Sequence, residues 1–455
     1  MTSFTQLQFI FRFFPVFFLI YYMVPWRMRS LVMIAGSLVF YATGDVRFVL
    51  LLILMSLVNW ALSSDEGKHQ RFWAVSAIVL DIGILATFKY LSHRFGQGMM
   101  PVGISFYTFR MVSYQADLLK AKFEKPSLTD SLAYFCMFPQ LVSGPIARYS
   151  DLSGMNDQWE AEEKKAFSER AALALTRLEQ GLVWFIPGFA MKVLLADHLA
   201  ILWNDIGTIG YESISTPLAW LGTVTYSLEL YFDFWGYSLM AAGIGVMLGY
   251  PFIKNFDHPY AAGSVSEFYR RWHVTLGTWF RDYVYIPLGG SRKGFVRTTV
   301  NLFAVWLLTA LWHGVTLNFL IWGMLLFIMI FWEKNIWSKN EKLKKVFGRI
   351  NVLVLIPVSW AVFAIPVTGD MMNFLSRLFG IGQAVSGNPM DFARLLSNYW
   401  PYLSMGLILL IPGISSWYMH NRKRFFIKLA LIALFWVTAY SVSARTGNPF
   451  MYLQF

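Results

Sequence analysis

The stretch that decides how this chain is interpreted is Leu302-Phe-Ala-Val-Trp-Leu-Leu-Thr-Ala-Leu-Trp-His-Gly314. Its composition is that of a membrane helix, but it ends on an ionisable side chain, which at membrane depth indicates a functional site. The chain as a whole has 455 residues, of which 56% are hydrophobic and only 14% charged, and its mean hydropathy is +0.49. Soluble domains carry roughly 25% charged residues. The sequence therefore predicts an all-α integral membrane protein.

Apolar runs near the length that a bilayer requires follow one another with short breaks. They lie at 9–24, 30–43, 47–62, 72–91, 178–202, 216–236, 299–315, 317–333, 350–368, 401–418 and 426–443. The shorter or more polar pieces 101–118, 130–146 and 237–250 are predicted to be re-entrant or buried helices, because broken helix at membrane depth needs cover from protein or a water-filled cavity. We predict one membrane-embedded domain over residues 1–455.

The net charge of +12 follows the breaks between these runs. Lysine and arginine gather in 118–126, 148–177, 251–297, 334–349 and 419–428, whereas 203–215 and 314–318 have none and 369–400 has two. The first group is expected in the cytoplasm and the second outside, which predicts a multi-pass protein of the cytoplasmic (inner) membrane. Nucleic-acid binding is not expected, because no motif for it accompanies the charge.

Two of the seven histidines stand apart from the others. His313 follows Trp312 and precedes Gly314, which lets a substrate or another backbone approach closely. His273 follows Trp272 in a segment where charges alternate with aromatic residues, which suggests a buried ion-pair network. These charges are Glu267, Arg270, Arg271, Arg281 and Asp282. From the residues alone, a structural role for His313 stays open.

Other kinds of site have little support. The single Cys136 excludes an internal disulfide and a cysteine metal cluster, and its apolar surroundings favour packing. Metal and nucleotide motifs such as HExxH, CxxC and GxxxxGK[ST] do not occur. The glycines of Gly243-Ile-Gly-Val-Met-Leu-Gly249 suit helix packing better than a dinucleotide site. No metal and no permanently bound cofactor are expected.

Four motifs, in a fixed order, carry a resemblance to a known family. They are Phe138-Pro-Gln-Leu-Val-Ser-Gly-Pro-Ile-Ala-Arg148, Asp233-Phe-Trp-Gly-Tyr-Ser through Asn255-Phe, the block from Arg270-Arg-Trp-His to Ile286-Pro-Leu-Gly-Gly290, and Leu311-Trp-His-Gly314. Together they resemble the membrane-bound O-acyltransferase (MBOAT) family. The chain is most similar to its bacterial branch of alginate O-acetyltransferase membrane subunits, which Val102–Tyr107 and the closing Asn448–Phe455 also match.

The resemblance implies an MBOAT-type ring of about 11–12 transmembrane helices, with re-entrant helices, around a central tunnel. It places the family core at about 100–330, flanked by helices in 1–99 and 331–455. By position, His313 matches the family's invariant catalytic histidine and His273 its second active-site residue.

An O-acyltransferase needs a base and a group that stabilises an oxyanion. His313 is the expected general base, and an acyl-imidazole on it is the alternative. The N–H groups of Trp312 and Trp272 are candidates for the oxyanion. Arg270, Arg271 and Arg281, with Asp282, are candidates for binding the donor phosphates, or alternatively for ion pairs with Glu267 and Asp282.

The expected reaction moves acetyl from a cytoplasmic-side donor, such as acetyl-CoA or an acyl carrier, to an extracytoplasmic polysaccharide. The longest outside loop, 369–400, is too short for a glycan-binding domain, so an extracytoplasmic esterase-like transferase partner is expected. D-alanyl or other acyl transfer to cell-wall polymers is an alternative within the family. A transporter or flippase of a polar lipid or glycan is the alternative from another class. Donor, acceptor polymer and oligomeric state stay open.

Overall fold

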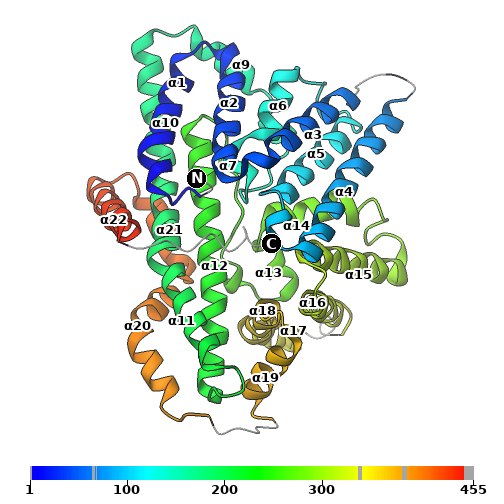
Figure 1. Ribbon diagram of the computed structural model, residues 1–455, viewed down its shortest axis with the longest axis vertical. Coiled ribbons are helices and arrows are strands. Elements are labelled where there is room, and N and C mark those ends of the chain that lie inside the picture. Colours follow the sequence, from blue (N-terminus) through cyan, green and yellow to red (C-terminus); the bar gives the residue numbers. More distant parts are fainter. Residues whose placement is uncertain (1–2, 64–66, 68, 337–340, 382–386, 445–455) are drawn as a thin grey trace. The chain divides into compact units, whose positions relative to one another are not determined.

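The computed structural model describes residues 3–63, 67, 69–336, 341–381 and 387–444 (Figure 1). These residues form helices and no strand, which confirms the all-α class. The closing motif Asn448–Phe455 lies outside the described residues. The chain divides into two compact units, the first built from Met1–Phe189, Gly236–Lys254 and Ala433–Gln454, and the second mainly from Ala190–Trp235 and Asn255–Ile432.

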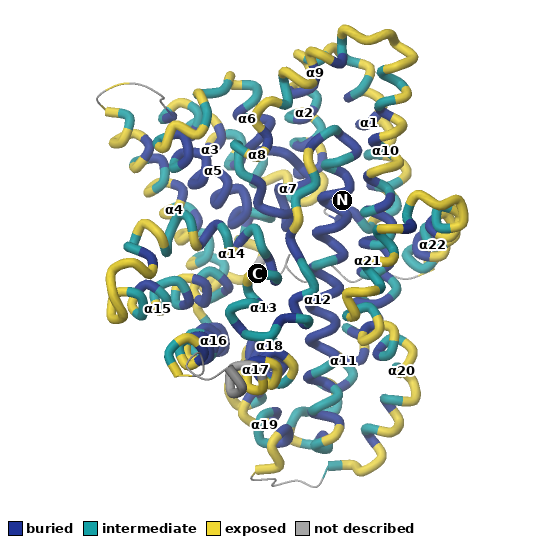
Figure 2. The backbone as a smooth tube through the Cα atoms, turned by 180° about the vertical axis from the view of Figure 1, so that it is seen from behind, coloured by how far each residue is buried: buried dark blue, intermediate teal, exposed yellow. Residues whose placement is uncertain are grey.

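The first unit contains both exposed and buried helices. They are α1 (Phe14–Met23), α2 (Trp26–Asp45), α3 (Val49–Leu62), α4 (Gln70–Phe95), α5 (Ile104–Leu118), α6 (Leu128–Cys136), α7 (Phe138–Leu141), α8 (Tyr149–Leu152), α9 (Met155–Glu163) and α10 (Phe167–Ala190). Figure 2 shows α5 almost wholly buried and α4 largely exposed. Residues 131–146, which contain most of α6 and all of α7, are also almost all buried, so the prediction of buried helices is confirmed for both 101–118 and 130–146.

The third predicted short piece, 237–250, is not separate. Residues 237–247 are the C-terminal third of α12 (Thr216–Met247), which continues without a break because its glycines admit a neighbouring helix instead of ending the helix. A Cβ built on Gly243 would lie 2.7 Å from the carbonyl oxygen of Gly181 in α10. The glycine pattern is thus a packing surface, as the sequence indicated.

The second unit carries the residues of interest. Its helices are α11 (Asp197–Ile209), the first part of α12, α13 (Val265–Arg271), α14 (Val274–Phe280), α15 (Gly294–His313), α16 (Leu317–Asn335), α17 (Glu341–Ile350), α18 (Ile356–Ala364), α19 (Thr368–Phe379), α20 (Asp391–Leu409), α21 (Pro412–Asn421) and the first part of α22 (Phe425–Ser443). α16 packs against both α15 and α18 (Figure 1).

Hydrogen bonds group the loops of the second unit in the way that the charge pattern predicts. Asp391 accepts from the backbone N–H of Ser215 at 2.8 Å, and Arg377 donates to the carbonyl of Glu212 at 2.9 Å, so the segments expected outside lie together. Arg349 donates to the carbonyl of Ala262 at 2.9 Å, which joins two segments expected inside. Which group faces the cytoplasm stays a prediction.

Seven helices in the described residues are long and apolar enough to cross a membrane, or eight if the bent pair α20 and α21 counts as one span. The protein is therefore a multi-pass membrane protein. The number is below the predicted 11–12 partly because 30–43 and 47–62 belong to one 37-residue run, Trp26–Leu62, and because Phe9–Met23 is short. The ring and the tunnel stay predictions.

Candidate active site

His313 is the last residue of α15 and lies among aromatic side chains. The helix ends there because Gly314 adopts extended backbone, and the His313 side chain is left in the interior, 8% exposed. Its ring centroid lies 4.4 Å from Trp312, 5.1 Å from Trp322, 5.0 Å from Phe363 and 6.0 Å from Phe319. An apolar wall of this kind excludes water and strengthens electrostatic interactions with the imidazole.

Gly314 has a specific steric role beside this histidine. A Cβ at this position would lie 2.6 Å from the Phe319 ring. The glycine therefore admits an aromatic side chain, where the sequence suggested the approach of a substrate or another backbone. Phe319 can thus pack against both His313 and Phe363.

His273 lies between α13 and α14 and is only 3% exposed. Its backbone is left-handed, with φ 44°, a conformation that is uncommon for a residue with a side chain. Its Nδ1 lies 3.0 Å from Oδ1 of Asn255, and its Nε2 is buried with no hydrogen-bond partner. Burial lowers the pKa of His273 to about 3, so the imidazole is neutral at physiological pH.

Asn255 is the site residue that sequence analysis missed. It was quoted only as part of a motif, and no spacing rule connects it with a histidine 18 residues later. In the fold, the backbone carbonyl of Asn255 accepts from the N–H of Val274 at 2.9 Å. The backbone N–H of Asp257 donates to the backbone carbonyl of Arg271, also at 2.9 Å. This short pairing of loop 255–257 with residues 271–274 places Asn255 against His273.

A row of tryptophans connects the surroundings of the two histidines. Trp322 lies beside His313, its ring is 5.8 Å from Trp360, and Trp360 is 5.0 Å from Trp272, the neighbour of His273 in the chain. Trp322 is 2% exposed, and its Nε1–H has no hydrogen-bond acceptor. The structure thus brings Trp272, His273 and His313 into one aromatic region. That the two imidazoles face one cavity stays a prediction.

The charged residues around His273 form local ion pairs, and the expectation of a buried network is wrong. Arg271 contacts Glu267 at 2.5 Å, and Arg281 contacts Asp282 at 2.7 Å. The Arg271, Glu267 and Arg281 side chains are 34%, 30% and 61% exposed, and Arg270 is exposed. The i,i+4 spacing sets Glu267 and Arg271 on one accessible face of α13, which supports the ion-pair alternative for these arginines.

We expect Arg271→Ala and Arg281→Ala to have small effects. Exposed ion pairs typically contribute about 0.2–1 kcal/mol, so the thermal stability of each variant should stay close to that of the wild type. The KM for the acyl donor should also be unchanged, and Arg270→Ala, an exposed arginine next to Arg271 on α13, is the matched variant for Arg271→Ala. A raised donor KM at normal protein yield would instead assign the substituted arginine to donor binding.

A second polar cluster contains Lys192, Asp197 and Asp233. Lys192, in the π-helical turn Met191–Ala196, contacts Asp197 at 2.5 Å and Asp233 at 2.8 Å, and its side chain is 3% exposed. Glu229, one turn before Asp233 on α12, is also buried, and its Oε2 has no hydrogen-bond partner. The motif that begins at Asp233 therefore contributes an ion pair that joins two helices.

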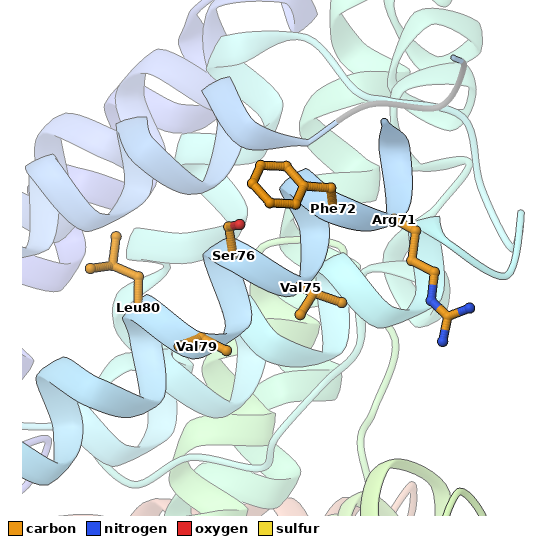
Figure 3. Close-up of a pocket in the computed structure, with 6 residues that line it drawn as sticks. All are labelled: Arg71, Phe72, Val75, Ser76, Val79 and Leu80. Carbon is orange, nitrogen blue, oxygen red and sulfur yellow. The ribbon is translucent and has the colours of Figure 1, made fainter. Parts of the chain in front are cut away.

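Cys136 and the surface groove on α4 belong to the first unit. Cys136 is buried, and burial raises its pKa to about 11, so its thiol stays protonated and it packs, as the sequence indicated. The groove on α4, with a volume of about 640 Å³, is lined by one face of a single helix (Figure 3). Its lining residues are Arg71, Phe72, Val75, Ser76, Val79 and Leu80, none of which is a predicted site residue.

These features define a polytopic helical membrane protein with two buried histidines in an aromatic interior. Residues 41–365 match the model of the membrane-bound O-acyltransferase family, and this range contains the core predicted from the motifs. The chain belongs to this family and is an O-acyltransferase, which sets aside the transporter alternative.

Named relatives cover the chain to different extents. A probable alginate O-acetylase AlgI of Pseudomonas putida is 30% identical, over 99% of this chain and 100% of the relative. A peptidoglycan O-acetyltransferase of Helicobacter pylori is 28% identical, over 82% of this chain and 79% of the relative. A teichoic acid D-alanyltransferase of Bacillus subtilis is 28% identical, over 59% of this chain and 69% of the relative.

Proposed function

We propose that the protein transfers an acetyl group from a cytoplasmic-side thioester donor to a hydroxyl at the outer side of the cytoplasmic membrane, for O-acetylation of an extracytoplasmic polysaccharide. The observation that carries this proposal is His313, buried in an aromatic wall beside the unsatisfied N–H of Trp322. A base and an N–H donor in one apolar region are the two elements that acyl transfer requires.

In the proposed reaction, His313 takes the proton of the acceptor hydroxyl while the hydroxyl oxygen attacks the thioester carbonyl. The tetrahedral intermediate then collapses. The C–S bond breaks with its electron pair going to sulfur, and the imidazolium of His313 returns the proton to the thiolate. The products are an ester and a free thiol. An acyl-imidazole on His313 is the alternative route.

Trp322 is the better-supported donor to the oxyanion. The sequence pointed to Trp312 and Trp272, which flank the histidines in the chain. Trp272 is buried, with its ring against Phe268 at 5.6 Å and Trp360 at 5.0 Å. The Nε1–H of Trp322 lies in the wall around His313 without an acceptor, and an unsatisfied buried donor of this kind is available to a developing negative charge.

The choice of acetyl and of a glycan rests on the relatives. Those that cover nearly the whole chain are named as alginate O-acetylases, and another as a peptidoglycan O-acetyltransferase. The D-alanyltransferases match a smaller share, so D-alanyl is the second candidate for the acyl group. The short outside loops support a relay, in which an esterase-like extracytoplasmic partner receives the acetyl group and passes it to the polymer.

The test is a sided reconstitution. Proteoliposomes containing this chain receive labelled acetyl-CoA on the cytoplasmic side and, on the other side, alginate or peptidoglycan with or without an esterase-like transferase. Label should reach the glycan only when the transferase is present, and D-alanyl carrier protein in place of acetyl-CoA should give none. Efficient glycan acetylation by this chain alone would show that the relay is unnecessary. Transfer of D-alanine from its carrier protein would show that D-alanyl, and not acetyl, is the acyl group.

A further inference from the structure

Three contacts converge on the side-chain oxygen of Asn255. This Oδ1 accepts from the backbone N–H of Thr275 at 3.3 Å, lies 2.9 Å from the Thr275 hydroxyl, and lies 3.0 Å from Nδ1 of His273. A backbone N–H can only donate, so the Asn255 atom at this point is an acceptor. The Nδ1 of His273 must then carry hydrogen.

This assignment fixes the tautomer of His273. A neutral imidazole carries one ring hydrogen, and with that hydrogen on Nδ1 the other nitrogen, Nε2, presents a lone pair. Nε2 is buried and has no hydrogen-bond partner in the fold. Buried polar atoms are nearly always satisfied in the working state of a protein, so a donor is expected to reach it.

We propose that Asn255 is a positioning residue, which holds His273 in the Nδ1–H tautomer so that Nε2 accepts a hydrogen bond from the hydroxyl group of the acyl acceptor. This inference rests on the proposed function for the identity of that hydroxyl. The hydroxyl is favoured over a donor thiol because S–H is a weak hydrogen-bond donor. Because Nε2 then carries no hydrogen, it cannot donate a hydrogen bond to the oxyanion of the tetrahedral intermediate.

The surroundings of His273 support an orienting role rather than that of the base. Phe234 from α12 lies edge-to-face with the imidazole at 4.7 Å, and the Nδ1 of His273 lies 3.0 Å from the amide oxygen of Asn255, so both of these neighbours are uncharged. With a pKa of about 3, the neutral ring accepts a hydrogen bond at Nε2 but does not hold a second proton at physiological pH. Proton removal is thus left to His313.

The backbone keeps Asn255 variants foldable. The backbone carbonyl of Asn255 accepts a hydrogen bond from the N–H of Val274, and this bond does not depend on the Asn255 side chain. The left-handed backbone of His273 is supported by the same loop pairing. Asn255→Ala therefore removes the acceptor for Nδ1 while the main-chain frame stays, and Asn255→Asp keeps the acceptor and adds a negative charge.

The first experiment measures the tautomer of His273 directly, by ¹⁵N NMR of the full-length protein labelled at its histidines. The His273 signal is identified as the one that is absent from the spectrum of His273→Gln. The wild type should show a protonated Nδ1 and an unprotonated Nε2, and Asn255→Ala a mixture of tautomers. Asn301→Ala removes a buried asparagine that donates to Gly290 elsewhere in the unit and should leave the signal unchanged. A protonated Nε2 in the wild type would overturn the proposal, whatever the substrate is.

The second experiment separates positioning from a general structural role. Asn255→Ala should lower kcat/KM at least about tenfold, with a raised KM for the hydroxyl acceptor and an unchanged KM for the donor. In Asn255→Asp the carboxylate favours the imidazolium and raises the pKa of His273. Its activity should be kept at high pH and lost as the pH falls through the raised pKa, a decline that the wild type lacks over the same range. A raised donor KM, or equal losses at every pH in both variants, would contradict the assignment.

Discussion

His313→Ala is expected to lower acyl transfer by about 10²–10⁴-fold, the usual cost of losing a general base. The imidazole lies in an aromatic wall formed by Trp312, Phe319, Trp322 and Phe363, which offers no other base to take over the acceptor proton. The measurement is the initial rate of label transfer from donor to a hydroxyl acceptor in proteoliposomes. His313→Gln, which keeps more of the side-chain volume, should lose as much activity.

The matched control is another buried histidine of the same unit. His198 on α11 stacks on Tyr402 with ring centroids 4.1 Å apart, and it has no place in the proposed reaction. His198→Gln should keep most of the activity, and both proteins should elute as monodisperse species. Retention of more than about a tenth of the wild-type rate in a well-folded His313→Ala protein would remove His313 from the base position.

Lys192→Met is expected to have the second largest effect, on stability. It removes the ammonium group that contacts the buried carboxylate of Asp233, one turn from Glu229, and the partly buried carboxylate of Asp197. Breaking a buried ion pair from one side typically costs about 3–5 kcal/mol, because a charge is left uncompensated. The purified variant should show a clearly lower unfolding temperature and a lower yield of monodisperse protein.

The control for Lys192→Met is a variant in which the two carboxylates that contact Lys192 are neutralised as well. The triple variant Lys192→Met/Asp197→Asn/Asp233→Asn removes the ammonium and both of its partners, and it should recover a large part of the lost stability. This recovery separates electrostatics from the loss of packing by the lysine stem. Wild-type stability in Lys192→Met alone would mean that the three side chains do not depend on one another.

Much of the architecture could be predicted from the sequence, because it depends on local composition. A run such as 302–313 is helical in a membrane whatever surrounds it, since its backbone must be satisfied within the segment. The unusual position of a histidine at the end of that run, and its motif, pointed to His313 in the same way. The spacing of Glu267 and Arg271 likewise predicted a pair that the fold forms at 2.5 Å.

The tertiary structure alone decided which side chains meet from distant parts of the chain. Asn255 reaches His273 because a loop pairs with residues 271–274, and Trp322 reaches His313 because α16 packs back on α15. The exposure of the arginines of α13 and of Arg281, and the burial of Lys192 with Asp233, depend on which helix face a neighbour covers. Periodicity fixes the faces of a helix, but the contact partner of each face is set by packing over long sequence separations, which a single sequence does not encode in any local pattern.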